Sequence, residues 1–202
     1  EREICLFAIG GYGRGEMFPR SDIDLLILTE DTSRWRPQIE DFIQRIYNFN
    51  FEIGHSVRTI EECVREMKND ISVETAVMER RHLAGSKDVS THLSTRLGLE
   101  SISEDDDYFG LKEVEQHNRH KQFQNVDYGL EPNIKNSPGG LRDIQTLMWI
   151  ALKRHKTASK RELVKLGVLT RNESRLLTAA EKFLRHTRFG LHLISKNKED
   201  RL

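Results

Sequence analysis

The feature that most constrains this chain is a glycine-rich turn followed by two acidic residues that open an apolar run. The turn spans residues 10–15 and reads Gly-Gly-Tyr-Gly-Arg-Gly, and the acids are Asp22 and Asp24. Side chains in a strand alternate between its faces, so these two carboxylates point the same way, roughly 6–7 Å apart at Cα. Two carboxylates that close raise each other's pKa unless a cation is present. The pair therefore predicts a Mg²⁺ site, because Mg²⁺ takes one or two protein carboxylates plus substrate phosphates.

The turn supplies groups that suit a phosphate. The backbone at Gly10, Gly11 and Gly13 can approach an anion closely, because glycine has no Cβ. Arg14 can clamp a phosphate bidentately, and Ser21 can donate a hydroxyl hydrogen bond. A glycine-rich turn alone, or an acidic pair alone, is more often an ordinary turn or helix cap. An ordinary turn, however, explains neither Arg14 nor two carboxylates that lead directly into an apolar run. The combination indicates metal-assisted phosphoryl or nucleotidyl transfer.

Composition excludes several classes of protein. Lys+Arg and Asp+Glu are balanced at 32 each over 202 residues, which argues against a general nucleic-acid binder. No apolar run approaches the length of a membrane span, and the N-terminus is no signal peptide. Cys5 and Cys63 fall in apolar patterns far apart, which predicts buried free thiols in a reducing cytoplasm. Because the chain starts almost directly in a strand, we expect it to be part of a longer protein.

Hydrophobic periodicity divides the chain into an α/β part and a helical part. We expect strands over residues 3–9, 22–29 and 51–57, and helices over 32–50, 60–68 and from about 72 to 85. From residue 86 the pattern is helical, with capping boxes such as Thr170 to Glu173. The last helix is expected to bury a set of apolar residues: Leu176, Leu177, Ala180, Phe183, Leu184, Leu191 and Ile194.

Three motifs resemble a known family. Gly10-Gly11 with Asp22-Ile23-Asp24 resembles the signature of the DNA polymerase β-type nucleotidyltransferase superfamily. The string GGYGRGEMFPRSDIDLLIL, with FEIGHSVRT at 51–59 and LEPNIK continuing through SPGGLRDI at 130–144, resembles the bacterial PII uridylyltransferase/uridylyl-removing enzymes. The resemblance runs through nearly the whole chain.

The resemblance implies a fold and a domain division. It implies an α/β (α+β) nucleotidyltransferase core with a mixed sheet over residues 1–85. An all-α helical domain over residues 86–202 would follow and close the cleft. Residues 125–145 would contribute to the active site.

The resemblance also implies further site residues. Members of the superfamily place a third carboxylate, often the general base, on the strand after the acidic pair. Glu52 and His55 both lie there, on opposite faces, and we choose Glu52. An Asp24-assisted mechanism stays open. The stretch 134–144 is also similar to a segment of the glutamine-synthetase adenylyltransferases.

In that stretch we expect Lys135 and Arg142 to bind nucleotide phosphates, beside the two glycines that precede a helix N-terminus. Asp143 would contact a metal ion or a hydroxyl. The alternative is an ordinary helix start with surface charges, and the sequence favours neither interpretation.

The implied activity is transfer of UMP from UTP to a tyrosine of the PII signalling protein, with release of pyrophosphate, in nitrogen regulation. Asp22 and Asp24 would hold Mg²⁺ on the UTP phosphates. No histidine is followed by aspartate, so we expect no uridylyl-removing activity, which the family places in a His-Asp domain. Two alternatives stay open, namely adenylyl transfer to glutamine synthetase or another acceptor, and a non-catalytic nucleotide-binding regulatory module.

Overall fold

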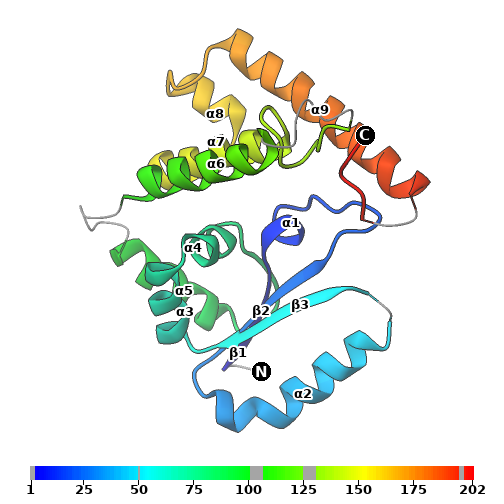
Figure 1. The fold of residues 1–202 in the computed structure, drawn as a ribbon. Coiled ribbons are helices and arrows are strands. Elements are labelled where there is room, and N and C mark those ends of the chain that lie inside the picture. Colours follow the sequence, from blue (N-terminus) through cyan, green and yellow to red (C-terminus); the bar gives the residue numbers. More distant parts are fainter. Residues whose placement is uncertain (1–2, 50, 101–106, 125–130, 196–197) are drawn as a thin grey trace. The chain divides into compact units, whose positions relative to one another are not determined.

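The computed structural model describes residues 3–49, 51–100, 107–124, 131–195 and 198–202. The chain divides into two compact units (Figure 1). The first unit comprises residues 1–17 and 21–106, and the second comprises 18–20 and 107–202. The short segment Phe18–Arg20 thus belongs to the second unit, although in the chain it lies between the glycine-rich turn and Asp22.

The first unit is built on a mixed four-stranded sheet in the order β3-β2-β1-β4. β1 pairs antiparallel with β2 and β4, whereas β2 and β3 are parallel. The elements in chain order are β1 Ile4–Ala8, α1 Gly10–Gly13, β2 Ile23–Thr29, α2 Thr32–Tyr47, β3 Ile53–Arg58, α3 Ile60–Asn69, α4 Ile71–Met78, β4 Arg81–Gly85 and α5 Lys87–Glu100. The predicted α/β core with a mixed sheet is confirmed.

One face of this sheet carries both the core and the acidic pair. Cys5 and Phe7 of β1 lie opposite Leu28 and Leu26 of β2, and α3, α4 and α5 pack over this row. Side chains two residues apart in a strand share a face, so Asp24 continues the same row beyond Leu26. The buried row therefore fixes the register that brings Asp24 to the end of the sheet. Figure 1 shows α2 beside β3, away from α3, α4 and α5.

The predicted helix up to Gly85 is wrong in its second half. The helix α4 ends at Met78, and Arg81–Gly85 form the edge strand β4. Gly85 has φ +91°, and a Cβ there would collide with the carbonyl oxygen of Ile4, so β4 approaches β1 very closely. Most of β4 is exposed, so its sequence does not show the alternation of apolar and polar residues that predicts a strand. Its extended conformation is determined by its pairing with β1.

The first unit continues beyond β4. Val89 and Leu93 of α5 lie in the same buried cluster as the sheet, which is why α5 groups with this unit. The expected functional boundary after residue 85 remains a prediction.

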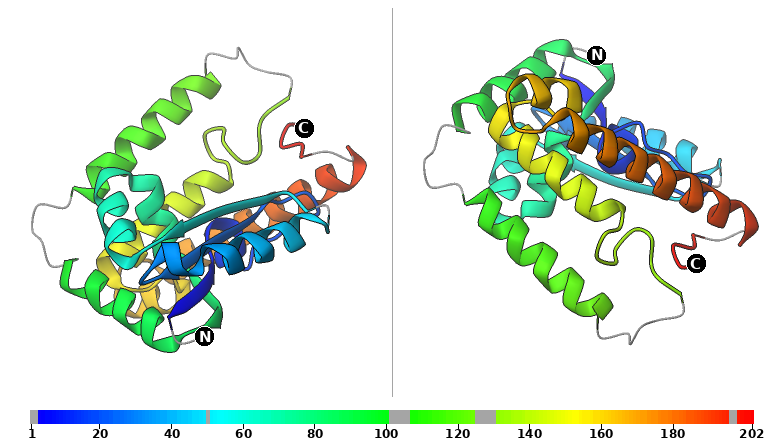
Figure 2. Two further views of the ribbon diagram at one scale, coloured as in Figure 1. Left: turned by 90° about the horizontal axis from the view of Figure 1, so that it is seen from below. Right: turned by 90° about the horizontal axis from the view of Figure 1, so that it is seen from above.

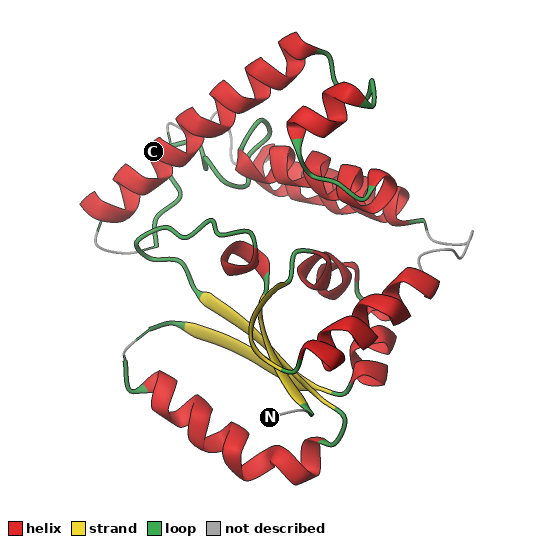
Figure 3. Cartoon of the chain, turned by 180° about the vertical axis from the view of Figure 1, so that it is seen from behind, coloured by secondary structure: helices red, strands yellow, loops and turns green. Residues whose placement is uncertain are grey.

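The described part of the second unit is helical, apart from an isolated bridge between Asn133 and Arg201 (Figure 3). Its helices are α6 Tyr108–Gln124, α7 Leu141–His155, α8 Lys160–Lys165 and α9 Arg171–Ile194. α6 and α7 lie side by side (Figure 2). The capping box of Thr170 with Glu173 is present at the start of α9, as predicted.

The buried face of α9 is not the one expected. Leu176, Phe183 and Ile194 are 58%, 69% and 83% exposed, and Ala180 is exposed too. Leu177, Leu184 and Leu191 are half-buried, whereas the fully buried side chains are those of Arg188 and His192. The helix carries two apolar stripes, and the inward one is completed by two polar residues, which periodicity alone does not predict.

The predicted state of the two cysteines is confirmed. Cys5 and Cys63 are free and buried, and burial raises the pKa of the Cys5 thiol to about 11. Among the helices that the structure describes, none combines the length and apolarity needed to cross a membrane.

Candidate active site

The acidic pair and the glycine-rich turn meet at one end of the sheet. Asp22 directly precedes β2 and Asp24 lies within it, and both are half-buried. The amide of Ile9 donates to the carbonyl of Asp24 at 3.0 Å, which holds the start of the turn beside this residue. Gly10 has φ +56°, and a Cβ there would lie 3.0 Å from Oδ2 of Asp24.

A second glycine, Gly54 of β3, lies against the same carboxylate. The parallel register places Gly54 opposite Asp24, and a Cβ at Gly54 would lie 2.6 Å from Oδ1 of Asp24. The carboxylate of Asp24 therefore occupies a space that two glycines, Gly10 and Gly54, leave open. Sequence reasoning missed Gly54, although a glycine inside a predicted strand signals a close approach.

The glycine-rich turn uses several of its own amides. Those of Gly13, Arg14 and Glu16 donate to the carbonyls of Ile9, Gly10 and Gly11 in turn, at 2.9, 3.1 and 2.8 Å. The first amides of a helical turn have no hydrogen-bond partner within that turn. The backbone amides predicted to bind a phosphate are therefore reduced to those of residues 10–12.

Gly13 serves packing. It is buried, and a Cβ there would collide with the carbonyl oxygen of Glu79. Its contribution to phosphate binding remains a prediction.

Arg14 is held between two carboxylates. Its Nε lies 2.9 Å from Glu16 and its Nη1 lies 2.5 Å from Glu79, whose side chain is only 4% exposed. Burial alone would lower the pKa of Arg14, but the two carboxylates outweigh burial and raise it. The guanidinium is therefore charged and fixed beside the turn, and its predicted binding of a triphosphate remains a prediction.

The strand after the acidic pair places the two candidate bases differently. The amide of Ile23 donates to the carbonyl of Glu52 at 2.8 Å, so extending the β2–β3 register by one residue sets exposed Glu52 beside Asp22. His55 lies opposite Leu25, on the other face, where its Nδ1 is 3.2 Å from the hydroxyl of Tyr47. The geometry favours Glu52, whose role remains a prediction. Ser21, also predicted, is half-buried and directly precedes Asp22.

Lys135 and Arg142 belong to the second unit, whereas the other predicted site residues belong to the first. Lys135 lies in the loop before α7 and Arg142 in the first turn of this helix. The carbonyl of Lys135 accepts from the amide of Arg142 at 2.9 Å. Of the stretch 125–145 predicted to contribute to the site, residues 125–130 lie outside the described part.

Asp143 joins two helices of the second unit. Its carboxylate accepts hydrogen bonds from Gln116, Arg119 and His120 of α6 and from the amide of Gly139. Burial alone would raise the pKa of Asp143, but these bonds outweigh burial and lower it. A carboxylate with four donors is suited to holding α6 against α7, which is a structural role.

The residues of the first unit fit a divalent cation. In the part of the chain that the structure describes, no group of three or more His, Cys, Asp or Glu gathers in a metal-binding arrangement. Mg²⁺ needs only one or two carboxylates when substrate phosphates complete its shell, so Asp22 and Asp24 suffice. A Cβ at Gly10 or Gly54 would fill the space beside the Asp24 carboxylate. Because both residues are glycines, the carboxylate has the room that a ligand of such an ion needs.

Two family models match the chain. Residues 2–82 match the family described as nucleotidyltransferase domain. Residues 108–202 match the family described as GlnD PII-uridylyltransferase. Nucleotidyltransferases of this family generally use a divalent metal.

Similar proteins are described as bifunctional uridylyltransferase/uridylyl-removing enzymes. The chain is 42% identical to the one from Stutzerimonas stutzeri over 202 residues, which is 99% of the chain and 22% of that relative. It is 42% identical to the one from Hydrogenovibrio crunogenus over 200 residues, again 99% and 22%. For the one from Pseudomonas fluorescens strain Pf-5 the values are 40% over 204 residues, 100% and 23%. The chain thus spans less than a quarter of the length of these relatives.

Proposed function

Because this chain belongs to the PII-uridylyltransferase family and contains a nucleotidyltransferase domain, we propose that it transfers UMP from UTP to a tyrosine of the PII signalling protein. Pyrophosphate is the leaving group. The observation that carries this proposal is the position of Asp24, which lies between Gly10 and Gly54 next to the glycine-rich turn.

Each residue of the first unit has a proposed task. Asp22 and Asp24 hold Mg²⁺, which when bound neutralises charge on the triphosphate and on the departing pyrophosphate. The amides of residues 10–12, with Arg14 and Ser21, orient the triphosphate for in-line attack. Glu52 accepts the proton of the attacking tyrosine hydroxyl.

The second unit and the setting complete the proposal. Lys135 and Arg142 supply positive charge toward the nucleotide phosphates. The reaction belongs to nitrogen regulation in the cytoplasm, with UTP and PII as partners. The chain has no His-Asp dipeptide, so we propose that it lacks uridylyl-removing activity.

The decisive experiment changes the acidic pair. In the double variant Asp22→Asn with Asp24→Asn, transfer of label from UTP to PII should fall on the order of 10³-fold, since the charges that hold the cation are gone. The matched control is Asp88→Asn, an exposed acid of α5, which should keep full activity. Label transfer that survives in the double variant contradicts the assignment.

A nucleotide panel separates the alternatives. Thermal shifts of the chain with UTP, ATP, CTP or GTP, each with Mg²⁺, should be largest for UTP. A larger shift with ATP, together with labelling of glutamine synthetase, would instead indicate adenylyl transfer. Binding of UTP without any turnover on PII would indicate a regulatory nucleotide-binding module.

A further inference from the structure

The two acids of the pair differ in how their backbone is held. Asp24 lies within β2, where pairing with β3 fixes it, whereas Asp22 directly precedes this strand. On the C-terminal side of Asp22, the amide of Ile23 donates to the carbonyl of Glu52 at 2.8 Å. On its N-terminal side lies Phe18–Arg20, which groups with the second unit. The contacts of this segment therefore decide how closely the backbone of Asp22 is fixed.

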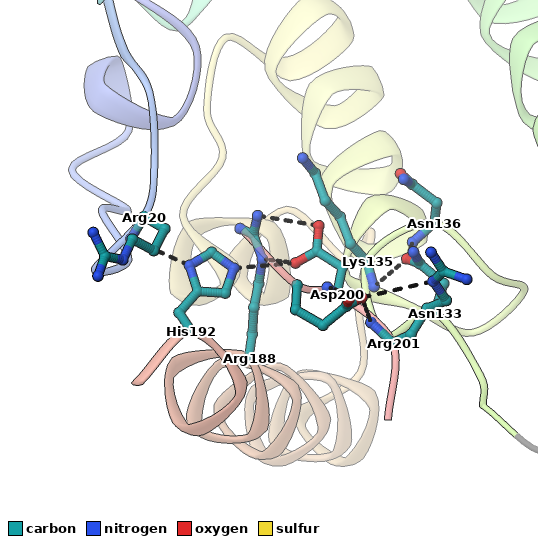
Figure 4. A network of polar contacts seen from close by, with 9 residues as sticks. Arg20, Asn133, Lys135, Asn136, Arg188, His192, Asp200 and Arg201 are labelled. Carbon is teal, nitrogen blue, oxygen red and sulfur yellow. Dashed lines mark hydrogen bonds and ion pairs between the residues drawn. The ribbon is translucent and has the colours of Figure 1, made fainter. Parts of the chain in front are cut away.

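His192 of α9 binds the backbone of this segment. The amide of Arg20 donates to Nδ1 of His192 at 3.3 Å, and Figure 4 shows the ring between Arg20 and Asp200. A nitrogen that accepts carries no proton, so the proton of the neutral ring is on Nε2, which lies 3.3 Å from Oδ1 of Asp200. The pKa of His192 is lowered, chiefly by burial, which agrees with a neutral ring.

The carboxylate of Asp200 is fixed as well. Its Oδ1 accepts from Nε of Arg188 at 2.6 Å, and these two side chains are 13% and 8% exposed. Burial alone would raise the pKa of Asp200, but the hydrogen bond and the charge of Arg188 outweigh burial and lower it. The carbonyl of Asp200 accepts from the amide of Ile134 at 2.8 Å. A charged carboxylate held in this way keeps the imidazole of His192 in one tautomer and one orientation.

The same segment is held at a second point, through the side chain of Phe18. The guanidinium carbon of Arg188 lies 4.3 Å from the ring centroid of Phe18, and the rings of Phe18 and His192 have centroids 5.9 Å apart. Pro19 has a fixed φ and restricts the preceding residue to extended conformations. The segment is thus held at Phe18 by ring contacts and at Arg20 by its amide.

Two residues, Ser21 and Asp22, lie between the held amides of Arg20 and Ile23. Consecutive Cα atoms are about 3.8 Å apart, so the Cα of Asp22 lies within about 7.6 Å of the Cα of Arg20. A short span that is fixed at both ends has little conformational entropy left to lose when its carboxylate binds an ion.

We propose that His192 is a positioning residue for Asp22, on which it acts through the amide of Arg20, and that Asp200 and Arg188 hold His192 for this task. The inference rests on the proposed function in one respect, namely that Asp22 binds a metal ion. Groups that orient a metal ligand typically change metal affinity or activity by about 10–100-fold when they are replaced. In this proposal α9 acts on the acidic pair through the backbone that leads into β2.

Two substitutions of His192 separate this role from a merely structural one. In His192→Asn the side-chain oxygen lies near the place of Nδ1 and can accept from Arg20, whereas the contact with Asp200 is lost. In His192→Gln the side-chain nitrogen lies near the place of Nε2 and can donate to Asp200, whereas the acceptor for Arg20 is lost. Both remove a buried ring, so both should lower stability to a similar extent, but His192→Gln alone should release the segment before Asp22.

The first readout is hydrogen exchange at the Arg20 amide, followed by NMR. This amide should exchange about tenfold faster or more in His192→Gln, because its acceptor is gone, and at nearly the original rate in His192→Asn. The matched control is His186→Gln, an exposed histidine of α9, which should leave the rate unchanged. Equal exchange of the Arg20 amide in the two His192 variants would overturn the proposal.

The second readout is affinity for Mn²⁺ alone, measured by electron paramagnetic resonance. His192→Gln should weaken Mn²⁺ binding about tenfold or more, and His192→Asn should retain most of it. Label transfer from UTP to PII should follow the same order, and a higher Mg²⁺ concentration should restore part of the loss in His192→Gln. Equal Mn²⁺ affinity in the two variants would show that His192 has a structural role only.

Phe18→Leu tests the proposal even if the His192 variants do not fold. Leucine keeps an apolar side chain at this half-buried position but removes the ring that Arg188 contacts. Mn²⁺ affinity should fall several-fold, as expected for the loss of a cation–π contact, while urea unfolding stays cooperative. The matched control is Phe183→Leu, an exposed position of α9, which should bind Mn²⁺ like the original chain. Unchanged affinity in Phe18→Leu would contradict the positioning role.

Failure of this proposal is distinguishable from failure of the proposed function. Label transfer that survives in the Asp22→Asn, Asp24→Asn variant contradicts the proposed function, whatever the exchange rate at Arg20. If transfer is lost there, but His192→Gln and His192→Asn bind Mn²⁺ and transfer label equally, the proposed function stands and the positioning role is wrong.

Discussion

At the scale of single residues, the carboxylate of Asp24 can occupy its position because its neighbours Gly10 and Gly54 have no Cβ atom. Gly10 and Gly54 leave the space on either side of its carboxylate, and any larger residue at either place would push it away. Charge alone does not fix a metal ligand, because a carboxylate must also be held where the ion will lie.

Changing Gly54 to Ala tests this directly. The added Cβ would lie 2.6 Å from Oδ1 of Asp24 and must displace it. A ligand displaced by about 1 Å costs on the order of 10²-fold in turnover, so we expect that loss together with a higher Mg²⁺ requirement. Stability should not fall, because alanine is favoured over glycine in a strand by about 0.5–1 kcal/mol. The assay is label transfer against Mg²⁺ concentration, with urea unfolding in parallel.

The control for this variant is Gly98→Ala, because a Cβ at Gly98 of α5 would meet nothing within 4 Å. It should leave both turnover and the Mg²⁺ requirement unchanged. Unchanged turnover in Gly54→Ala, or a loss that follows a drop in stability, would remove Gly54 from the site.

At the scale of elements, α1 and α4 are joined by an ion pair. Arg14 follows α1, and its partner Glu79 follows α4 with a nearly buried side chain. Glu16 holds the same guanidinium from a side chain that is 17% exposed. Removing the more buried partner should cost more, because the attraction between Arg14 and Glu79 is screened less by water than the attraction between Arg14 and Glu16.

We therefore expect unequal costs for two matched variants. Glu79→Gln should lower the free energy of unfolding by about 3 kcal/mol, and Glu16→Gln by at most about 1 kcal/mol. Urea denaturation of the two variants and the original chain measures both differences. If Glu16→Gln costs as much as Glu79→Gln, the link between α1 and α4 does not depend on burial.

How far the sequence predicts these elements depends on how local their signals are. The site residues of the first unit that the sequence predicts lie within one short stretch, namely Asp22, Asp24 and the glycines of the turn. Their pattern can therefore be recognised without knowledge of the fold. The strand β4 has a single half-buried side chain, Leu83, and its structure comes from pairing with a distant strand. A glycine within a predicted strand, such as Gly54, indicates that another group approaches the backbone closely. That this group is the carboxylate of Asp24 follows only from the β2–β3 register.

The same holds in the second unit. Arg188 and His192 are charged or polar residues in a helix whose apolar positions were expected inside. Their burial depends on Asp200, which reaches them from the C-terminal residues, and on the amide of Arg20. Partners that far apart in the chain leave no periodic pattern, so sequence reasoning had no means of predicting this cluster.

At the scale of the whole molecule, the two units should respond to alkali in opposite directions. In the first unit, burial raises the pKa of Cys5 to about 11 and also raises that of Cys63. In the second, burial and neighbouring cations lower the pKa of Lys135 to about 8. Stability rises with pH wherever the unfolded chain binds more protons than the folded one, and falls in the opposite case.

Between pH 8 and about 10 the unfolded chain keeps a proton at Lys135 that the folded chain has lost, so the second unit should become more stable. Above pH 9 the folded chain keeps the Cys5 proton that the unfolded chain loses, so the first unit should become less stable. Discounted for screening at half-buried Lys135, the gain is about 1 kcal/mol, which corresponds to a rise of about 4–8 °C in Tm.

The two tryptophans allow each unit to be followed separately, because Trp35 lies in α2 and Trp149 in α7. Fluorescence melts of Trp149→Phe, which retains Trp35, should show a Tm that falls from pH 9 to 10.5. Melts of Trp35→Phe should show one that rises from pH 8 to 10. Adding Lys135→Gln to the second should flatten its rise, and adding Cys5→Ala to the first should reduce its fall. A Tm that falls in both reporters would show that Lys135 is not held in a cationic environment, since only a lysine that loses its proton early can stabilise its unit as pH increases.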